Sequence, residues 1–114
     1  MSSRDAGDYI EDIFDAMLDI QEFTAEYSYD QFVNDRKTQY AVIRAIEIIG
    51  EASKNLPLEI REKYRNVPWR EMATMRDRLI HGYFGVDLLI LWDTVQQDIP
   101  PLIPIFRSLL EEIE

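Results

Sequence analysis

Apolar residues recur at helical spacing through two long segments, and this periodicity constrains the fold more than any other feature. Residues 8–26, DYIEDIFDAMLDIQEFTAE, place acids on one face and an apolar stripe on the other. The members of this stripe are Ile10, Ile13, Phe14, Met17, Ile20 and Phe23. Residues 35–56 carry a wider apolar band, made of Ala41, Val42, Ala45, Ile46, Ile48, Ile49 and Ala52. That width predicts a central helix that is packed on two sides.

Aspartates and prolines mark where the helices should begin and break. Asp5 or Asp8 is expected to cap the first helix, because an aspartate at that position accepts orphan backbone amides. Asp87 is expected to cap a last helical region over residues 88–113 in the same way. The prolines of this region should break it into two segments or kink it, and they are Pro100, Pro101 and Pro104.

Two glycines carry further information about packing and helix ends. Gly50 lies in the middle of the predicted central helix, where glycine costs about 1 kcal/mol relative to alanine. We therefore expect another backbone to approach closely there. After Pro68, a helix should run from about Trp69 to near His81, with Gly82 as its left-handed terminator. This helix should turn three apolar side chains inward, those of Met72, Met75 and Leu79.

The remaining segments complete an all-α pattern. Residues 29–33 read as a short helical turn, residues 56–68 read as a loop with a short helix, and no segment reads as a strand. No repeat or linker divides the chain, so we predict one all-α domain over residues 1–114, folded as an antiparallel bundle of four or five helices. The absence of cysteine excludes disulfides and thiolate metal sites. Neither a signal-peptide core nor a membrane-spanning apolar run is found, which predicts a cytoplasmic protein with no membrane partner.

The charge of the chain is strongly segregated. The formal net charge is −10, which by itself argues against a nucleic-acid partner. Residues 1–35 carry ten acids and one base, residues 36–78 carry ten bases and six acids, and residues 79–114 carry six acids and one base. The positive charge therefore lies in the middle third, either as solvated helix faces or as a local basic groove on an acidic body.

The stretch MRDRLIHGYFG, residues 75–85, holds the only histidine of the chain. On an ideal helix Asp77 lies about 40° from His81, with Arg78 close to them, but Arg76 lies about 140° away. One helix thus cannot aim Arg76 and His81 at the same small site. Either the helix distorts near Gly82 or the site is assembled between two copies of the chain, which predicts a homodimer.

One histidine with neighbouring arginines suits metal-independent cleavage of RNA, in which the 2′-hydroxyl is the nucleophile. His81 would transfer the proton, and Arg76 would bind the phosphate and stabilise the charge of the transition state. Asp77 would orient the imidazole or raise its pKa. A metal site is a poor competitor because scattered acids with one histidine form no ligand set. From spacing alone it remains open that His81 only complements a helix C-terminus, with Arg76 and Arg78 as surface charges.

The same stretch resembles the signature of the HEPN superfamily, an arginine and a polar residue followed shortly by a histidine, here Arg76, Asp77 and His81. The tyrosine two positions later, Tyr83, narrows the resemblance to the HepT family, the ribonuclease toxins of HepT–MntA toxin–antitoxin systems. The segments FVNDRKTQYAVIRAIEIIGEASKNLP, VPWREMATMRDRLIHGYFGVD and LWDTVQQDIPPL resemble that family in the same order. The likeness therefore extends over nearly the whole chain.

This resemblance implies a HEPN fold, a homodimer whose two motifs face each other across a cleft, and a ribonuclease that uses neither metal nor cofactor. Arg76 and His81 would be the catalytic pair, supported by Asp77 and Arg78. The family commonly has asparagine where this chain has Asp77, and a carboxylate that paired with either arginine would weaken phosphate binding.

The resemblance also implies a partner and a means of silencing. Tyr83 matches the tyrosine that an MntA-type nucleotidyltransferase antitoxin modifies with AMP. The added phosphates would place negative charge and bulk beside Arg76 and His81 and so block the RNA phosphate. Toxin and antitoxin would form a complex, in which the homodimer becomes part of a larger assembly with the antitoxin.

Two non-enzymatic functions are the alternatives. The chain would then be a helical adaptor that binds a minimal nucleotidyltransferase or presents its nucleotide substrate, or a structural dimerisation domain with the helix from Tyr40 to Ala52 as its interface.

Overall fold

The computed structural model describes residues 5–79 and 85–113, and most of these residues are helical. In chain order the elements are α1 (Ala6–Thr24), α2 (Tyr29–Val33), α3 (Arg36–Asn55), α4 (Leu58–Lys63), α5 (Trp69–Ala73), the 3₁₀ helix η1 (Met75–Leu79), α6 (Leu88–Asp93), the π-helix η3 (Thr94–Asp98) and α7 (Leu102–Ile113). Within the two described ranges no strand occurs. The predicted all-α class is confirmed.

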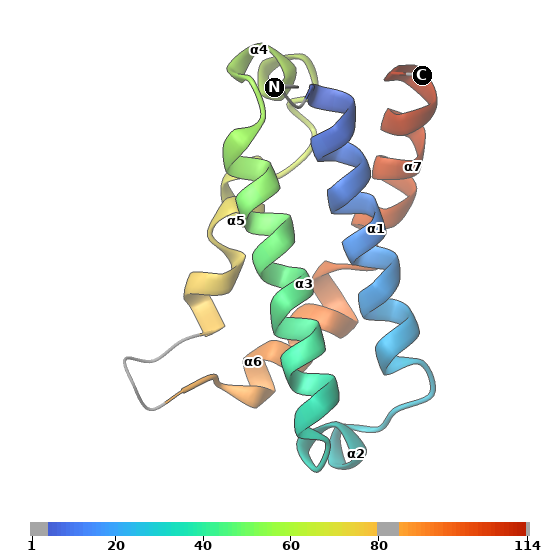
Figure 1. The fold of residues 1–114 in the computed structure, drawn as a ribbon, viewed down its shortest axis with the longest axis vertical. Helices are drawn as coiled ribbons and strands as arrows, with labels where there is room; N and C mark the ends of the chain where they lie inside the picture. Colours follow the sequence, from blue (N-terminus) through green and yellow to red (C-terminus); the bar gives the residue numbers. More distant parts are fainter. Residues whose placement is uncertain (1–4, 80–84, 114) are drawn as a thin grey trace, which may run out of the picture.

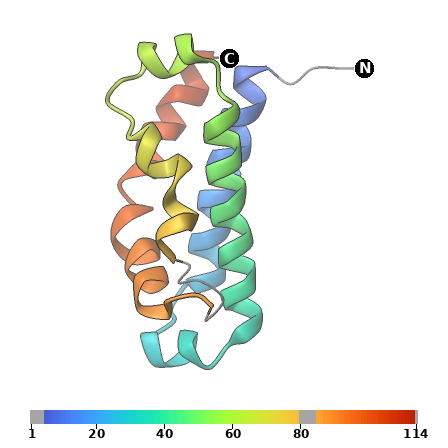
Figure 2. The same ribbon diagram turned by 90° about the vertical axis from the view of Figure 1, so that its left-hand side faces the viewer.

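The helices form two groups that pack face to face. α1 and α3 run antiparallel side by side, and α7 lies along α1 with its C-terminus near the start of that helix (Figure 1). Seen from the side, α1 and α3 form one half of the molecule, and the chain from α5 to α7 forms the other (Figure 2). Since α3 contacts α1 on one side and both α5 and η1 on the other, the predicted packing of this helix on two sides is confirmed.

Aspartates begin the helices as the sequence predicts. The carboxylate of Asp5 accepts from the backbone N–H of Asp8 at 2.9 Å, and the carboxylate of Asp8 accepts in return from Asp5 N–H at 3.2 Å. This reciprocal pair satisfies two backbone donors at the start of α1. At α6, Asp87 accepts from the backbone amides of Leu89 and Ile90. The predicted caps of the first and last helical regions are therefore confirmed.

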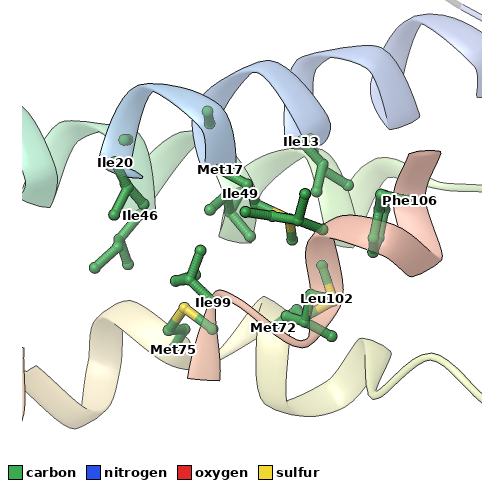
Figure 3. Close-up of a cluster of buried hydrophobic side chains, with 14 of the residues drawn as sticks. Ile13, Met17, Ile20, Ile46, Ile49, Met72, Met75, Ile99, Leu102 and Phe106 are labelled. Atoms are coloured by element: carbon green, nitrogen blue, oxygen red, sulfur yellow. The ribbon is translucent and has the colours of Figure 1, made fainter. Parts of the chain in front are cut away.

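The core joins the two halves of the molecule. Ile13, Met17 and Ile20 of α1 and Ile46 and Ile49 of α3 point toward the C-terminal half (Figure 3). From that half, the side chains that meet them are those of Met72, Met75, Ile99, Leu102 and Phe106. Met72, Met75 and Leu79 are buried as predicted. This core fixes α5 and η1 against α3 and so sets where their polar side chains emerge.

The prediction that Phe23 belongs to the apolar stripe of the first helix is wrong. Phe23 is 39% exposed, whereas Thr24 beside it is buried. On a helix of 100° per residue, Phe23 lies about 60° beyond Ile20, outside the apolar stripe, and Thr24 lies inside it. The hydroxyl of Thr24 donates to the carbonyl of Ile20 at 2.8 Å, which makes its burial acceptable.

The predicted continuous helix from Trp69 to near His81 is also wrong. α5 ends at Ala73, and the chain continues from Met75 as the 3₁₀ helix η1. The hydroxyl of Thr74 donates to the carbonyl of Arg70 at 3.0 Å, a kind of bond that often bends helices. The backbone N–H of Asp77 donates to the carbonyl of Thr74, three residues before it, at 2.9 Å. The predicted helix end near His81 and its terminator Gly82 lie outside the described residues.

The last helical region is divided where the prolines predict, but not by every proline. The chain breaks at Pro100 and Pro101, between η3 and α7. Pro104 lies in the first turn of α7 and leaves it intact, because the first backbone amides of a helix have no acceptor within the helix. Among the helices of the described ranges, none has the length and apolar character needed to cross a membrane.

Candidate active site

Three of the polar residues singled out in the sequence, Arg76, Asp77 and Arg78, lie on η1 and point in different directions. Met75 and Leu79 bury the ends of this short helix, and Arg76, Asp77 and Arg78 between them are exposed. Successive residues of a 3₁₀ helix are about 120° apart, so three consecutive side chains leave on three sides. Arg76 reaches α3 and Arg78 reaches η3. His81 and Tyr83, the other two predicted site residues, lie outside the described residues.

Arg76 is held by an acid that the sequence reading did not single out. Its Nε donates to Oε2 of Glu47 on α3 at 2.9 Å, and the two side chains are 46% and 33% exposed. Glu47 precedes Arg76 by 29 positions, so only the packing of η1 on α3 brings them together. A spacing signal did exist in the sequence. Four charged residues share one face of α3, namely Arg44, Glu47, Glu51 and Lys54.

This charged face of α3 forms one wall of a cavity of about 290 Å³, and the other wall comes from α5 and η1. The lining residues are Arg44, Glu47, Gly50, Glu51, Lys54, Ala73, Arg76 and Asp77. Three of them are cations and three are acids. The middle third of the chain thus supplies a cavity of mixed charge rather than a purely basic groove.

Gly50 sets the width of this cavity. A Cβ atom at this position would lie 3.3 Å from the carbonyl oxygen of Ala73 and 3.5 Å from that of Met72. The end of α5 therefore rests directly on the backbone of α3, one turn from Glu47. The predicted close approach of another backbone at Gly50 is confirmed.

Arg78 lies away from this cavity. Its Nη2 is 3.4 Å from Oδ2 of Asp98 at the end of η3, and both side chains are about half exposed. Within the described ranges, Arg76 and Arg78 pair with Glu47 and Asp98 respectively, and neither pairs with Asp77. The 3₁₀ geometry turns the three side chains apart, so among the described residues the Asp77 carboxylate does not compete for either arginine. Asp77 instead faces the cavity that Arg76 lines.

The cavity can therefore present the guanidinium anchored by Glu47, two further cations and the carboxylates of Glu51 and Asp77 to a ligand. In the described part of the chain, no three histidine, cysteine, aspartate or glutamate side chains gather as a metal site.

Comparisons with known proteins point to one family. The family model described as "Ribonuclease HepT-like" matches residues 13–109. A protein of Thermococcus cleftensis named "Probable ribonuclease HepT" is 56% identical over 106 residues, which cover 93% of this chain and 96% of that protein. A Methanocaldococcus jannaschii protein, provisionally named an RNase, is 45% identical over 114 residues, which cover 100% of this chain and 94% of that protein. No solved structure gives a significant match.

Proposed function

Because this chain belongs to the HepT-like ribonuclease family, we propose that it cleaves RNA without a metal and that Arg76 and His81 form its catalytic pair. The observation that carries this proposal is the position of Arg76. Its guanidinium is held at the wall of a cavity through Nε, and among the described residues its remaining N–H groups have no partner, so that they can bind a phosphate. Arg44 and Lys54 on the opposite wall are placed to attract the neighbouring phosphates of a strand.

The proposed reaction is an attack of the RNA 2′-hydroxyl oxygen on the adjacent phosphorus. One imidazole accepts the hydroxyl proton, the bond from phosphorus to the 5′-oxygen breaks, and that oxygen receives a proton as it leaves. The products are a 2′,3′-cyclic phosphate and a 5′-hydroxyl. Arg76 binds the non-bridging oxygens, where negative charge grows in the transition state. Asp77 lines the same cavity and orients the imidazole of His81. Arg78, through its ion pair with Asp98, supports η1, the helix that carries Arg76 and Asp77.

A homodimer is part of this proposal. Acid and base steps use two proton-transfer groups, but each chain has one histidine. Two antiparallel helical bundles of residues 1–114, with their motifs facing across a shared cleft, would supply a second imidazole and a second Arg76. The dimer would also double the number of cations around the RNA, which matters for a chain of net charge −10.

We further propose that the chain is the toxin of a toxin–antitoxin pair and acts in the cytoplasm. An MntA-type nucleotidyltransferase antitoxin would silence it by AMPylation of Tyr83. The phosphates added there would compete with RNA for Arg76 and His81.

The direct test is RNA cleavage by the purified protein in EDTA. We expect His81→Ala and Arg76→Ala to lower cleavage by about a hundredfold or more, the usual contribution of a proton-transfer group or a charge-stabilising donor. Arg70→Ala is the matched control, because Arg70 is an exposed arginine on α5 that does not line the cavity.

Full activity in either site variant would overturn the proposed catalytic pair. If the wild-type protein cleaves no RNA but binds the nucleotidyltransferase tightly, the adaptor function is correct instead. Incubation with the nucleotidyltransferase and ATP tests the silencing step. We expect the mass to increase by AMP units in the wild type but not in Tyr83→Phe.

A further inference from the structure

The bond between Arg76 and Glu47 assigns a role to a residue outside the sequence motif. We infer that Glu47 is a positioning residue, whose carboxylate holds the guanidinium of Arg76 in the orientation that binds the scissile phosphate. This inference rests on the proposed catalytic role of Arg76. The opposite interpretation is that Glu47 occupies the arginine and so competes with RNA.

The atom that Glu47 contacts distinguishes these interpretations. The carboxylate accepts from Nε, on the side of the guanidinium, at 2.9 Å. Within the described ranges, Arg76 makes no other hydrogen bond or ion pair, so the two terminal nitrogens remain available as a fork. A phosphate binds such a fork through two parallel hydrogen bonds. Glu47 therefore constrains the arginine without using the donors that the phosphate needs.

The anchoring matters because of where Arg76 lies. Its own element, η1, is a five-residue 3₁₀ helix that gives a long exposed side chain little support. A long arginine side chain loses rotamer freedom when it is fixed, and this loss opposes binding. Glu47 extends from α3, a helix of 20 residues whose inner face is buried in the core. Part of the ordering of Arg76 is thus already achieved before RNA binds.

The backbone fixes the distance between the two partners. One turn after Glu47, Gly50 lets the carbonyl of Ala73 rest on α3, and η1 starts two residues later at Met75. The elements that carry the two side chains therefore cannot slide apart without breaking this contact.

Neighbouring cations limit the repulsion between Glu47 and RNA. Arg44 lies one turn before Glu47 on the same face of α3, and Lys54 lies at the other end of this face, beyond Glu51. The charged face of α3 has no net charge, so the carboxylate can act on Arg76 without making the cavity negative.

The inference is tested with Glu47→Ala and Glu47→Gln in steady-state cleavage of a fluorogenic RNA oligonucleotide. Loss of the anchor should lower kcat of Glu47→Ala by roughly ten- to a hundredfold, as for other misplaced catalytic groups. KM should stay the same or fall, because a negative charge near the RNA has been removed. Glu47→Gln retains an oxygen that accepts from Nε and should recover part of kcat. Glu62→Gln on α4, exposed and away from the cavity, has the same change of charge and should keep the wild-type kcat.

A second measurement follows the arginine directly and does not depend on activity. In ¹⁵N-resolved NMR spectra, the Nε–H signal of Arg76 should exchange slowly with water in the wild type and quickly in Glu47→Ala. Urea unfolding shows whether each variant is folded. If Glu47→Ala does not fold, the comparison is made with Glu47→Gln instead. An unchanged or higher kcat in a folded Glu47 variant, or unchanged Nε–H exchange, would overturn the positioning role. The proposed function fails separately, if Arg76→Ala or His81→Ala keeps full cleavage or if the wild type cleaves no RNA.

Discussion

The contact at Gly50 yields the sharpest test of how the cavity is built. Gly50→Ala in an unobstructed helix would gain about 1 kcal/mol of stability from helix propensity alone. Here the new Cβ would lie 3.3 Å from the carbonyl oxygen of Ala73, which belongs to the backbone of α5 and cannot rotate away. We expect this contact to cancel the gain, so that the free energy of unfolding changes by less than about 0.5 kcal/mol.

Gly50→Val extends the perturbation, because its methyl groups have to displace the end of α5. Overpacking of this kind costs about 1–3 kcal/mol, so we expect a loss of about 2 kcal/mol and a Tm about 8 °C lower. The assay is urea and thermal unfolding followed by far-UV circular dichroism, at one fixed protein concentration because a dimer unfolds in a concentration-dependent way. Gly7→Ala is a comparison, since its Cβ would meet only side-chain atoms of Asp5 and Ile113. If Gly50→Ala gains the full 1 kcal/mol and Gly50→Val unfolds like the wild type, the backbone of α5 does not rest on α3 and the reasoning is refuted.

Three further predictions concern residues away from the cavity. Gly85 has φ of +101° with open space around it, so Gly85→Ala should lose about 1 kcal/mol in urea unfolding through backbone strain alone, and an unchanged value would contradict that φ. The hydroxyl of Tyr27, followed by the side chain and amide of Thr38, lowers the pKa of Asp35 from 3.8 to about 2. The stability that these bonds give is complete above pH 3.8 and is lost as the pH falls toward 2, so Tyr27→Phe should raise the Asp35 pKa in an NMR titration and move acid unfolding to higher pH. Phe23→Gln should change the free energy of unfolding by less than about 0.5 kcal/mol, whereas Met17→Ala should cost about 2–5 kcal/mol, and similar losses in the two would contradict their different burial.

Much of the fold can be read from the sequence because its long helices have strong local signals. The apolar stripes identify α1 and α3, and Asp5 and Asp87 accept the first backbone amides of the helices that they precede. Even a tertiary contact is predictable at Gly50, since a glycine inside a helix is unfavourable unless another backbone needs the space.

The break at Thr74 could not be predicted in the same way. Met75 and Leu79 are four positions apart, which is the spacing of inward residues on an α-helix, so the apolar periodicity in the sequence predicts an α-helix where the structure has a 3₁₀ helix. The hydroxyl of Thr74 donates to the carbonyl of Arg70 at the break, but Ser53 makes the same bond to Ile49 inside the uninterrupted α3, so such a residue does not by itself predict where a helix ends.

In the candidate site, too, local features are predictable from the sequence and contacts between distant segments are not. The sequence identifies Arg76 by its motif, because the motif is local. It does not identify Glu47, whose relation to Arg76 depends on which face of α3 meets η1. The row of charges that includes Arg44 and Lys54 is visible in the sequence, but an exposed helix in any soluble protein can carry such a row.

The π-helix η3 has a consequence for how the length of this region can vary. A π-turn contains one residue more than an α-turn, so deletion of a single residue within Thr94–Asp98 would restore ordinary helical winding. In a continuous helix the deletion would also turn the residues after it by about 100° around the helix axis, so that Asp98 would move away from Arg78 and Ile99 away from the core. The extra residue of the π-turn therefore keeps the ion pair of Asp98 and the burial of Ile99 in register at the same time. A chain shortened at this turn should lose stability as well as the contact between η3 and the helix that carries the arginines.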